Sequence, residues 1–221
     1  MLRISEVQGS GVNVAIVGPV MVEAIVTSLF EDDDQLSGFF LQEEDPDSDR
    51  DPATPEGIFV YCSTACPDDL AVGDRVTVVG VAGEFGGASQ INASVGSVTI
   101  RSSGKDLPTA TPLSLPAPAG TRAEGTFENV EGMIVTCSGR LVVNEYYWLA
   151  RYGQLVLTDG PYLRPRHHGR HLRHHLLPAH AHVTATGGFL PRPALRVRGR
   201  RGGSGGGNTV GRPRERLGRP S

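Results

Sequence analysis

Five short apolar runs separated by turn-forming residues occupy the first hundred residues of the chain. They lie at residues 20–30, 36–42, 57–62, 74–85 and 97–103. The last run alternates apolar and polar residues, as a half-buried strand does, and no long amphipathic helical stretch lies between any two of them. With 29 glycines and 16 prolines as further breaks, the pattern predicts an all-β fold.

The order of these runs favours one all-β architecture. Gly80 and Gly83 interrupt the fourth run, where a curled strand could bend. The segment between the third and fourth runs, "CPDDLAVGD", is long enough for one helical turn at most. Five glycine-bent strands with a small helical element after the third match the plan of an OB-like five-stranded barrel, which we place at residues 1–104.

The rest of the chain divides into three parts. Residues 105–120 read as a proline-rich linker, expected to be extended and stiff. Residues 121–160 begin a second strand series, which we interpret as a truncated second β unit; the alternative assigns it to the first sheet. Residues 161–221 hold 13 Arg, 11 Gly, 7 Pro and 7 His, with too few apolar strands for a core. We expect a disordered basic tail there.

The net charge of -3 conceals an asymmetry between these parts. Residues 1–160 carry 8 Lys+Arg against 23 Asp+Glu, giving -15, whereas residues 161–221 carry 13 Arg against one Glu, giving +12. One lysine against twenty arginines is typical of a GC-rich gene, and a shifted reading of such DNA yields Arg, Pro, Gly and His. We therefore hypothesise a frameshift near Gly160; a genuine cationic tail is the alternative.

Several segments share their order and spacing with one family of enzymes. They are "ISEVQGSG" (4–11), "VEAIVT" (22–27), the loop-bearing stretch 38–62, "AVGDRVTVVGVAGEFGGASQI" (71–91), "EGMIVT" (131–136) and "NEYYWLARYGQLVL" (144–157). Over about residues 4–160 the chain resembles the non-catalytic β region of secreted bacterial ExeM/NucH-like extracellular nucleases. In that family an OB-like domain precedes an endonuclease/exonuclease/phosphatase catalytic domain that uses a divalent metal.

The resemblance implies a nucleic-acid-handling accessory module, extracellular although no signal peptide is visible in the first residues. The family's catalytic domain would begin after residue 160, where Glu215 is the sole carboxylate side chain. We therefore predict no catalytic residue, no hydrolysis by this chain alone, weak binding of DNA or RNA, no membrane partner and a monomer. The alternative function is a calcium-stabilised extracellular spacer or adhesion module that binds no nucleic acid.

Acidic residues alternate along the loop between the second and third runs. The candidate Ca²⁺ ligands are Asp45, Asp47, Asp49, Asp51 and Glu56. An EF-hand is excluded, because Arg50 stands at the sixth position, where that loop needs glycine, and because the flanks are strands. A looser Ca²⁺ loop and a solvated hairpin tip both remain open.

Aromatic and basic residues are the candidates for nucleic-acid contact. If Ile58 and Val60 face the interior, Phe59 and Tyr61 face outward and could stack on bases. The remaining candidates are Arg75, Arg101, Tyr147 and Arg151. The alternative is that the aromatic rings pack in the core or between the modules. The charge of -15 also opposes phosphate binding.

Two further patterns concern cysteine and histidine. Cys62 and Cys66 could form a small disulfide loop in an oxidising compartment, or remain reduced at a strand end. All seven histidines lie between residues 167 and 182, where they could capture transition metals opportunistically. A shaped metal site is not expected there, because no cysteine or acidic partner accompanies them.

Overall fold

A computed structural model describes residues 1–31, 35–115, 127–147, 149, 155–158 and 182–185. The first five strands are β1 (Gly18–Phe30), β2 (Gly38–Gln42), β3 (Gly57–Tyr61), β4 (Arg75–Phe85) and β5 (Ala88–Ser102). Two short helical elements accompany them, α1 (Ile4–Gln8) and the 3-10 turn η1 (Ser63–Ala65). The described chain is mostly β, which confirms the predicted fold class, and η1 follows the third strand as expected.

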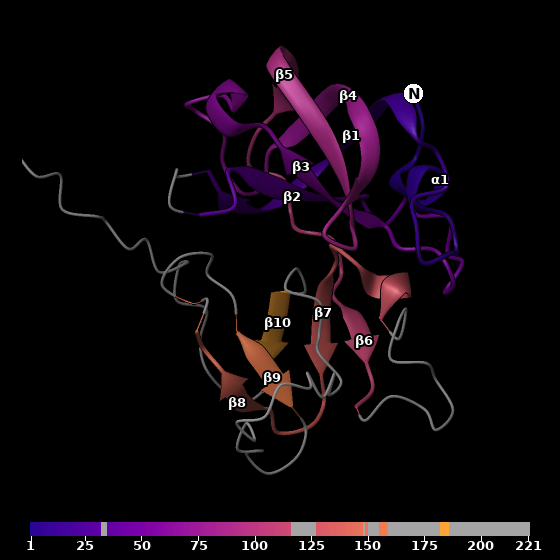
Figure 1. Cartoon of the computed structure of the whole chain (residues 1–221), viewed down its shortest axis with the longest axis vertical. Coiled ribbons are helices and arrows are strands. Elements are labelled where there is room, and N and C mark those ends of the chain that lie inside the picture. The colour runs from indigo at the N-terminus through magenta and orange to yellow at the C-terminus, as the bar shows by residue number, and fades with distance from the viewer. Residues whose placement is uncertain (32–34, 116–126, 148, 150–154, 159–181, 186–221) are drawn as a thin grey trace, which may run out of the picture. The chain divides into compact units, whose positions relative to one another are not determined.

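The five strands form one closed sheet in the order β1-β2-β3-β5-β4 (Figure 1). The long strand β1 pairs antiparallel with both β2 and β4, and this double pairing completes the ring. Strands β3 and β5 run parallel, whereas the other neighbours are antiparallel. Gly80 lies at a register shift between β4 and β5, where an added Cβ would stand 2.6 Å from the Asn92 carbonyl oxygen. The strand therefore bends at the predicted glycine.

The interior of the closed sheet is the main hydrophobic core. Phe39, Leu41, Ile58, Val60 and Val78 are fully or almost fully buried in it. Helix α1 adds two more buried side chains from the N-terminal segment, Ile4 and Val7. Burying an aliphatic or aromatic side chain of this size contributes about 1.5–3 kcal/mol, so this cluster holds the fold together.

A second group of short elements follows. These are β6 (Thr111–Leu113), the 3-10 turn η2 (Glu128–Val130), β7 (Ile134–Cys137), β8 (Val142–Glu145), β9 (Val156–Thr158) and β10 (His182–Ala185). Strands β10, β7 and β6 form a parallel sheet in that order, and β8 pairs with β9. Two positions differ from our expectation: β6 lies within the expected linker 105–120, and β10 lies within the expected tail 161–221.

Residues 127–137 pack against β2 and β3 through close backbone contacts. Gly57 and Gly132 face each other so tightly that a Cβ added to Gly132 would lie 2.8 Å from the Ile58 nitrogen. The Ile134 amide donates a 2.8 Å hydrogen bond to the buried side chain of Gln42. A glycine at each side of the contact is therefore what permits this approach.

Candidate functional site

Most carboxylates of the acidic loop accept hydrogen bonds from donors within the same loop. Asp49 accepts from the Asp51 amide at 2.8 Å and from the Thr54 hydroxyl at 3.0 Å, and Asp51 accepts from the Ala53 amide at 2.9 Å. Burial opposes ionisation of Asp49, but hydrogen bonds led by that from the Asp51 amide outweigh it and lower its pKa. These carboxylates thus order the loop as local acceptors.

The remaining predicted calcium ligands have other partners. Asp45 accepts hydrogen bonds from the side chain and amide of Thr109, which lower its pKa, and Asp47 lies 3.8 Å from Arg75. Within the described residues, no group of three or more Asp, Glu, His or Cys side chains is placed to hold a metal ion. The five carboxylates do not converge, which favours the hairpin-tip alternative; calcium binding stays a prediction.

Glu56 differs from the other acidic residues of the loop because it is turned inward. Its side chain is 6% exposed, and its Oε1 accepts 2.7 Å hydrogen bonds from the Ser48 hydroxyl and the Asp49 amide. Its Oε2 is buried and has no hydrogen-bond partner in the structure. Burial raises the pKa of Glu56, against the opposing effect of the hydrogen bond from Ser48.

The two aromatic residues predicted to face outward on β3 have different surroundings. Phe59 is only 8% exposed and packs against Phe40, with 4.9 Å between ring centroids. Phe59 is therefore buried and not exposed as a stacking platform, and it lies outside the cluster of side chains that contains Ile58 and Val60. Tyr61, at the end of β3, is 40% exposed, and Tyr147 is 72% exposed.

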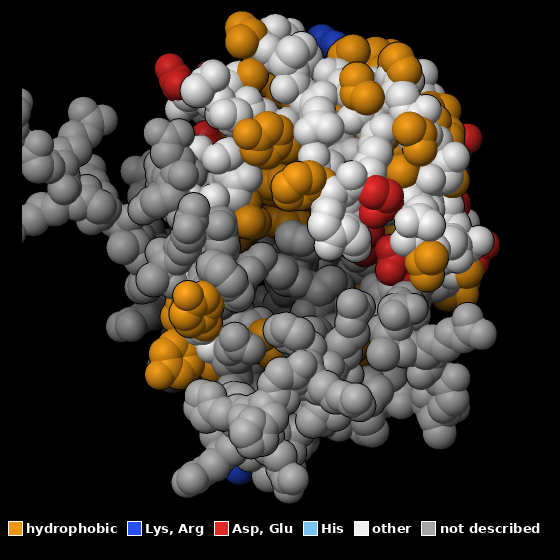
Figure 2. Space-filling model, viewed as in Figure 1, with side chains coloured by type: hydrophobic (Ala, Val, Ile, Leu, Met, Phe, Trp, Pro, Cys, Tyr) orange, Lys and Arg blue, Asp and Glu red, His pale blue; other side chains and the backbone are white. Residues whose placement is uncertain are grey.

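The candidate basic residues bind carboxylates of the protein itself. Arg75 forms ion pairs with Glu23 at 2.9 Å and Glu44 at 3.2 Å, while Arg101 lies 3.8 Å from Glu23 and donates to Thr77. These guanidinium groups are committed to intramolecular pairs and do not form a basic patch, and Figure 2 shows more acidic than basic side chains on the visible face. Arg151 lies outside the described residues.

Cys62 and Cys66 are joined by a disulfide, with 5.1 Å between their Cα atoms. The bridge closes a short loop around η1, directly after β3. Of the two alternatives left open by the sequence, the structure has the oxidised form, which persists in extracellular compartments. Cys137 is buried and unbridged, and burial raises the pKa of its thiol.

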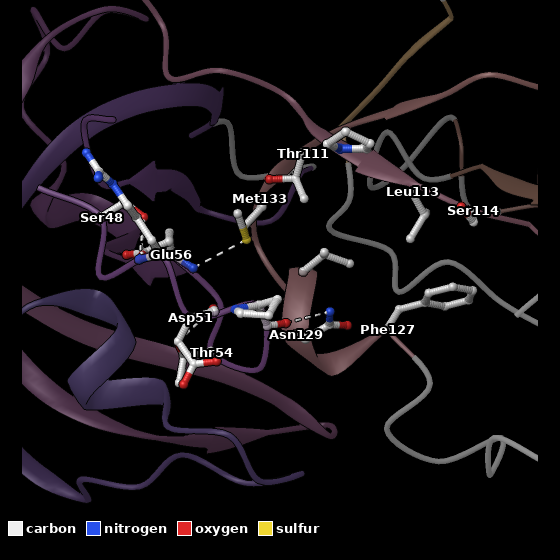
Figure 3. A pocket seen from close by; sticks show the side chains of 14 residues that line it. Ser48, Asp51, Thr54, Glu56, Thr111, Leu113, Ser114, Phe127, Asn129 and Met133 are labelled. Carbon is white, nitrogen blue, oxygen red and sulfur yellow. Dashed lines mark hydrogen bonds between the residues drawn. The ribbon is translucent and has the colours of Figure 1, made fainter. Parts of the chain in front are cut away.

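A pocket that the sequence did not reveal lies between the acidic loop and the β6–β7 region (Figure 3). Its volume is about 570 Å³. One wall comes from loop residues Ser48, Asp51, Thr54 and Glu56. The other comes from residues 111–114 and from Phe127, Asn129, Val130 and Met133. The two walls are more than 50 positions apart in the chain, so no local sequence pattern could have joined them.

Two further glutamates are buried, one beside helix α1 and the other against β5, and no sequence pattern indicated either. Glu43 and Glu131 are each 4% exposed. Glu43 accepts a 2.8 Å hydrogen bond from the Ile4 amide, and Glu131 accepts long 3.3 Å hydrogen bonds from the Ser89 amide. Burial raises the pKa of each carboxyl to about 7. Glu128 adds like-charge repulsion at Glu131.

Comparison of the chain with protein-family models, curated proteins and solved structures finds no match. Within the part that the structure describes, no helix has the length and apolar character needed to cross a membrane.

Proposed function

We propose that the closed sheet is an OB-like barrel and that the chain is the non-catalytic, nucleic-acid-handling region of a secreted nuclease. The observation that carries this proposal is the ring order β1-β2-β3-β5-β4, with a helical turn directly after β3. A five-stranded ring in which the last two strands exchange places matches the Greek-key barrel of OB folds. The Cys62–Cys66 disulfide supports secretion.

Nucleic-acid contact in this proposal is weak and relies on stacking. Tyr61 and Tyr147 are the exposed aromatic candidates, and one stacked base contributes about 1–3 kcal/mol. Because Arg75 and Arg101 are engaged in ion pairs within the protein, they can neutralise little phosphate charge. We expect single-stranded DNA or RNA to bind at low salt and to dissociate as salt is raised.

The test is fluorescence anisotropy of a labelled single-stranded oligonucleotide with the full chain and its Tyr61→Ala variant. Because the thirteen arginines after residue 160 bind polyanions without specificity, photocrosslinking should locate the contact. Crosslinks at Tyr61, and weaker binding by Tyr61→Ala, support the proposal. Crosslinks confined to residues 161–221 contradict it.

The ion pairs of Arg75 and Arg101 also favour a second candidate, an extracellular spacer or adhesion module that binds no nucleic acid. As predicted from the sequence, this candidate includes calcium bound at the acidic loop. It predicts no crosslinks to residues 1–158 at any salt concentration. In either case the purified chain, incubated with plasmid DNA, Mg²⁺ and Ca²⁺, is expected to leave the DNA uncut.

A further inference from the structure

We propose that the pocket between the acidic loop and the β6–β7 region binds an organic cation, and that the alkyl-guanidinium group of an arginine side chain fits it best. This inference concerns a different site from the stacking surface around Tyr61 and goes beyond the proposed nucleic-acid role. It rests on a buried acceptor, on a second carboxyl beside it and on an apolar opposite wall.

The buried acceptor is Oε2 of Glu56. The other oxygen of this carboxyl is satisfied by Ser48 and Asp49, but Oε2 has no partner, although Glu56 lines the pocket and is 6% exposed. An unsatisfied buried acceptor is costly, and the cost is larger for a charged group. A donor that enters the pocket and reaches Oε2 would remove that cost.

Two further acidic residues lie close to this acceptor. The Asp49 amide donates to the Oε1 atom of Glu56 at 2.7 Å, and Asp51 lines the pocket. Burial raises the pKa of Glu56, and a bound cation would favour its charged form, so binding should weaken as the pH falls.

Few charged side chains line the pocket, and together they favour a cation. Asp51 and Glu56 oppose one exposed guanidinium, that of Arg50. The net charge of -15 over residues 1–160 attracts cations from a distance. The carboxyl groups of Asp51 and Glu56 supply far fewer oxygens than the six to eight that Ca²⁺ takes, which favours an organic cation over a metal ion.

The opposite wall suits a hydrocarbon stem. Leu113 on β6, Phe127, Val130 and Met133 line it, and Figure 3 shows Met133 beside Glu56, with Leu113 farther from the loop. A volume of about 570 Å³ lies within the range of small-molecule pockets and far exceeds that of a bare ion. Guanidinium is more weakly hydrated than ammonium and keeps its charge when buried, so arginine is favoured over lysine.

The test is isothermal titration of the full chain with Nα-acetyl-arginine methylamide, and with the neutral citrulline analogue as ligand control. We expect the arginine probe to bind at least tenfold more tightly than the citrulline probe at pH 7.5, and more weakly at pH 5. Glu56→Gln should lower the affinity at least tenfold, whereas Asp68→Asn, an equal charge change at an exposed site, should leave it unchanged.

Leu113→Trp provides a second variant, which fills the pocket from β6 without altering the loop and should also abolish binding. Equal affinity for the two probes, or full affinity in folded Glu56→Gln, would overturn the proposal. A change of all thirteen arginines after residue 160 to glutamine separates two sources of the ligand. Tighter probe binding in that variant identifies the chain's own arginines as competitors, and unchanged binding identifies a separate molecule. No binding to either chain refutes the site.

Discussion

The closed sheet and the β6–β10 region have hydrophobic cores of very different size. The closed sheet gathers eighteen buried side chains into one cluster, whereas the described part of the second region gathers four: Phe127, Val130, Met133 and Val135. A core of four side chains offsets little of the conformational entropy lost on ordering a chain. The second region must therefore draw its stability from contact with the closed sheet, through the Gly57–Gly132 approach and the hydrogen bonds from Ser89 to the buried Glu131.

The largest expected effect tests the closed sheet itself. Phe39 on β2 is fully buried, so Phe39→Ala should lower the free energy of unfolding by about 3–5 kcal/mol. Urea denaturation followed by circular dichroism measures this loss. Val79→Ala, at an exposed position on β4, is the control and should stay within about 0.5 kcal/mol of the natural chain. Similar losses in both variants would contradict a core inside this ring.

Local patterns account for the closed sheet better than for its surroundings. All five strands were predicted, because each contains an apolar run ended by turn residues, but β5 begins at Ala88, nine residues before the predicted run at 97–103. The register shift at Gly80 follows from the missing side chain. The burial of Phe59 was left open by the sequence, because it depends on Phe40 from the neighbouring strand. Alternation tells which face a residue occupies but not whether that face is covered.

The second region was predicted less well for a related reason. Strand β6 contains Pro112 and lies in a proline-rich stretch, and it forms a strand only because β7 supplies the hydrogen-bonding partner. Its place at the edge of the sheet tolerates proline. The pocket and the roles of Glu56 and Glu131 likewise depend on residues distant in the chain. Pairings of this kind leave no periodic pattern in the sequence.

The next effect in size is the pH dependence of the contact between the two regions. The pKa of Glu131 in the folded protein is about 7, raised from 4.5 mainly by burial. The folded state thus binds more protons than the unfolded state between these values, so its stability is full below pH 4.5 and is lost as pH rises through 7. The loss for this carboxyl is up to roughly 3 kcal/mol.

Urea midpoints at pH 5 and pH 8 measure this dependence, and Glu131→Gln should reduce the difference between them. Glu43 keeps part of the dependence in that variant, because its pKa is raised to about 7 as well. Glu6→Gln, at an exposed position of α1, is the matched control and should leave the difference unchanged. A midpoint that rises from pH 5 to pH 8 would contradict the burial of these carboxyls in neutral form.

The third prediction, with a smaller expected effect, tests the glycine contact between the two regions. A Cβ at position 57 would overlap the Gly132 carbonyl group, and overpacking of this kind costs about 1–3 kcal/mol. Gly57→Ala should therefore speed hydrogen exchange at the Ile134 amide, while amides inside the closed sheet stay protected. Gly83→Ala on β4, where nothing lies within 4 Å of the added Cβ, should leave exchange at Ile134 unchanged. Equal exchange in both variants would show that the two regions do not rely on this contact.

The smallest expected effect concerns metal at the acidic loop. Asp45, Asp49 and Asp51 already accept hydrogen bonds from Thr109, Thr54 and main-chain amides, so removal of calcium leaves these three carboxylates with their donors. The melting temperature should therefore be the same in excess chelator and in millimolar Ca²⁺. Asp47→Asn weakens the ion pair with Arg75, and it should change the melting temperature by the same amount in calcium and in chelator. A higher melting temperature in calcium that Asp49→Asn removes would restore the loop as a cation site.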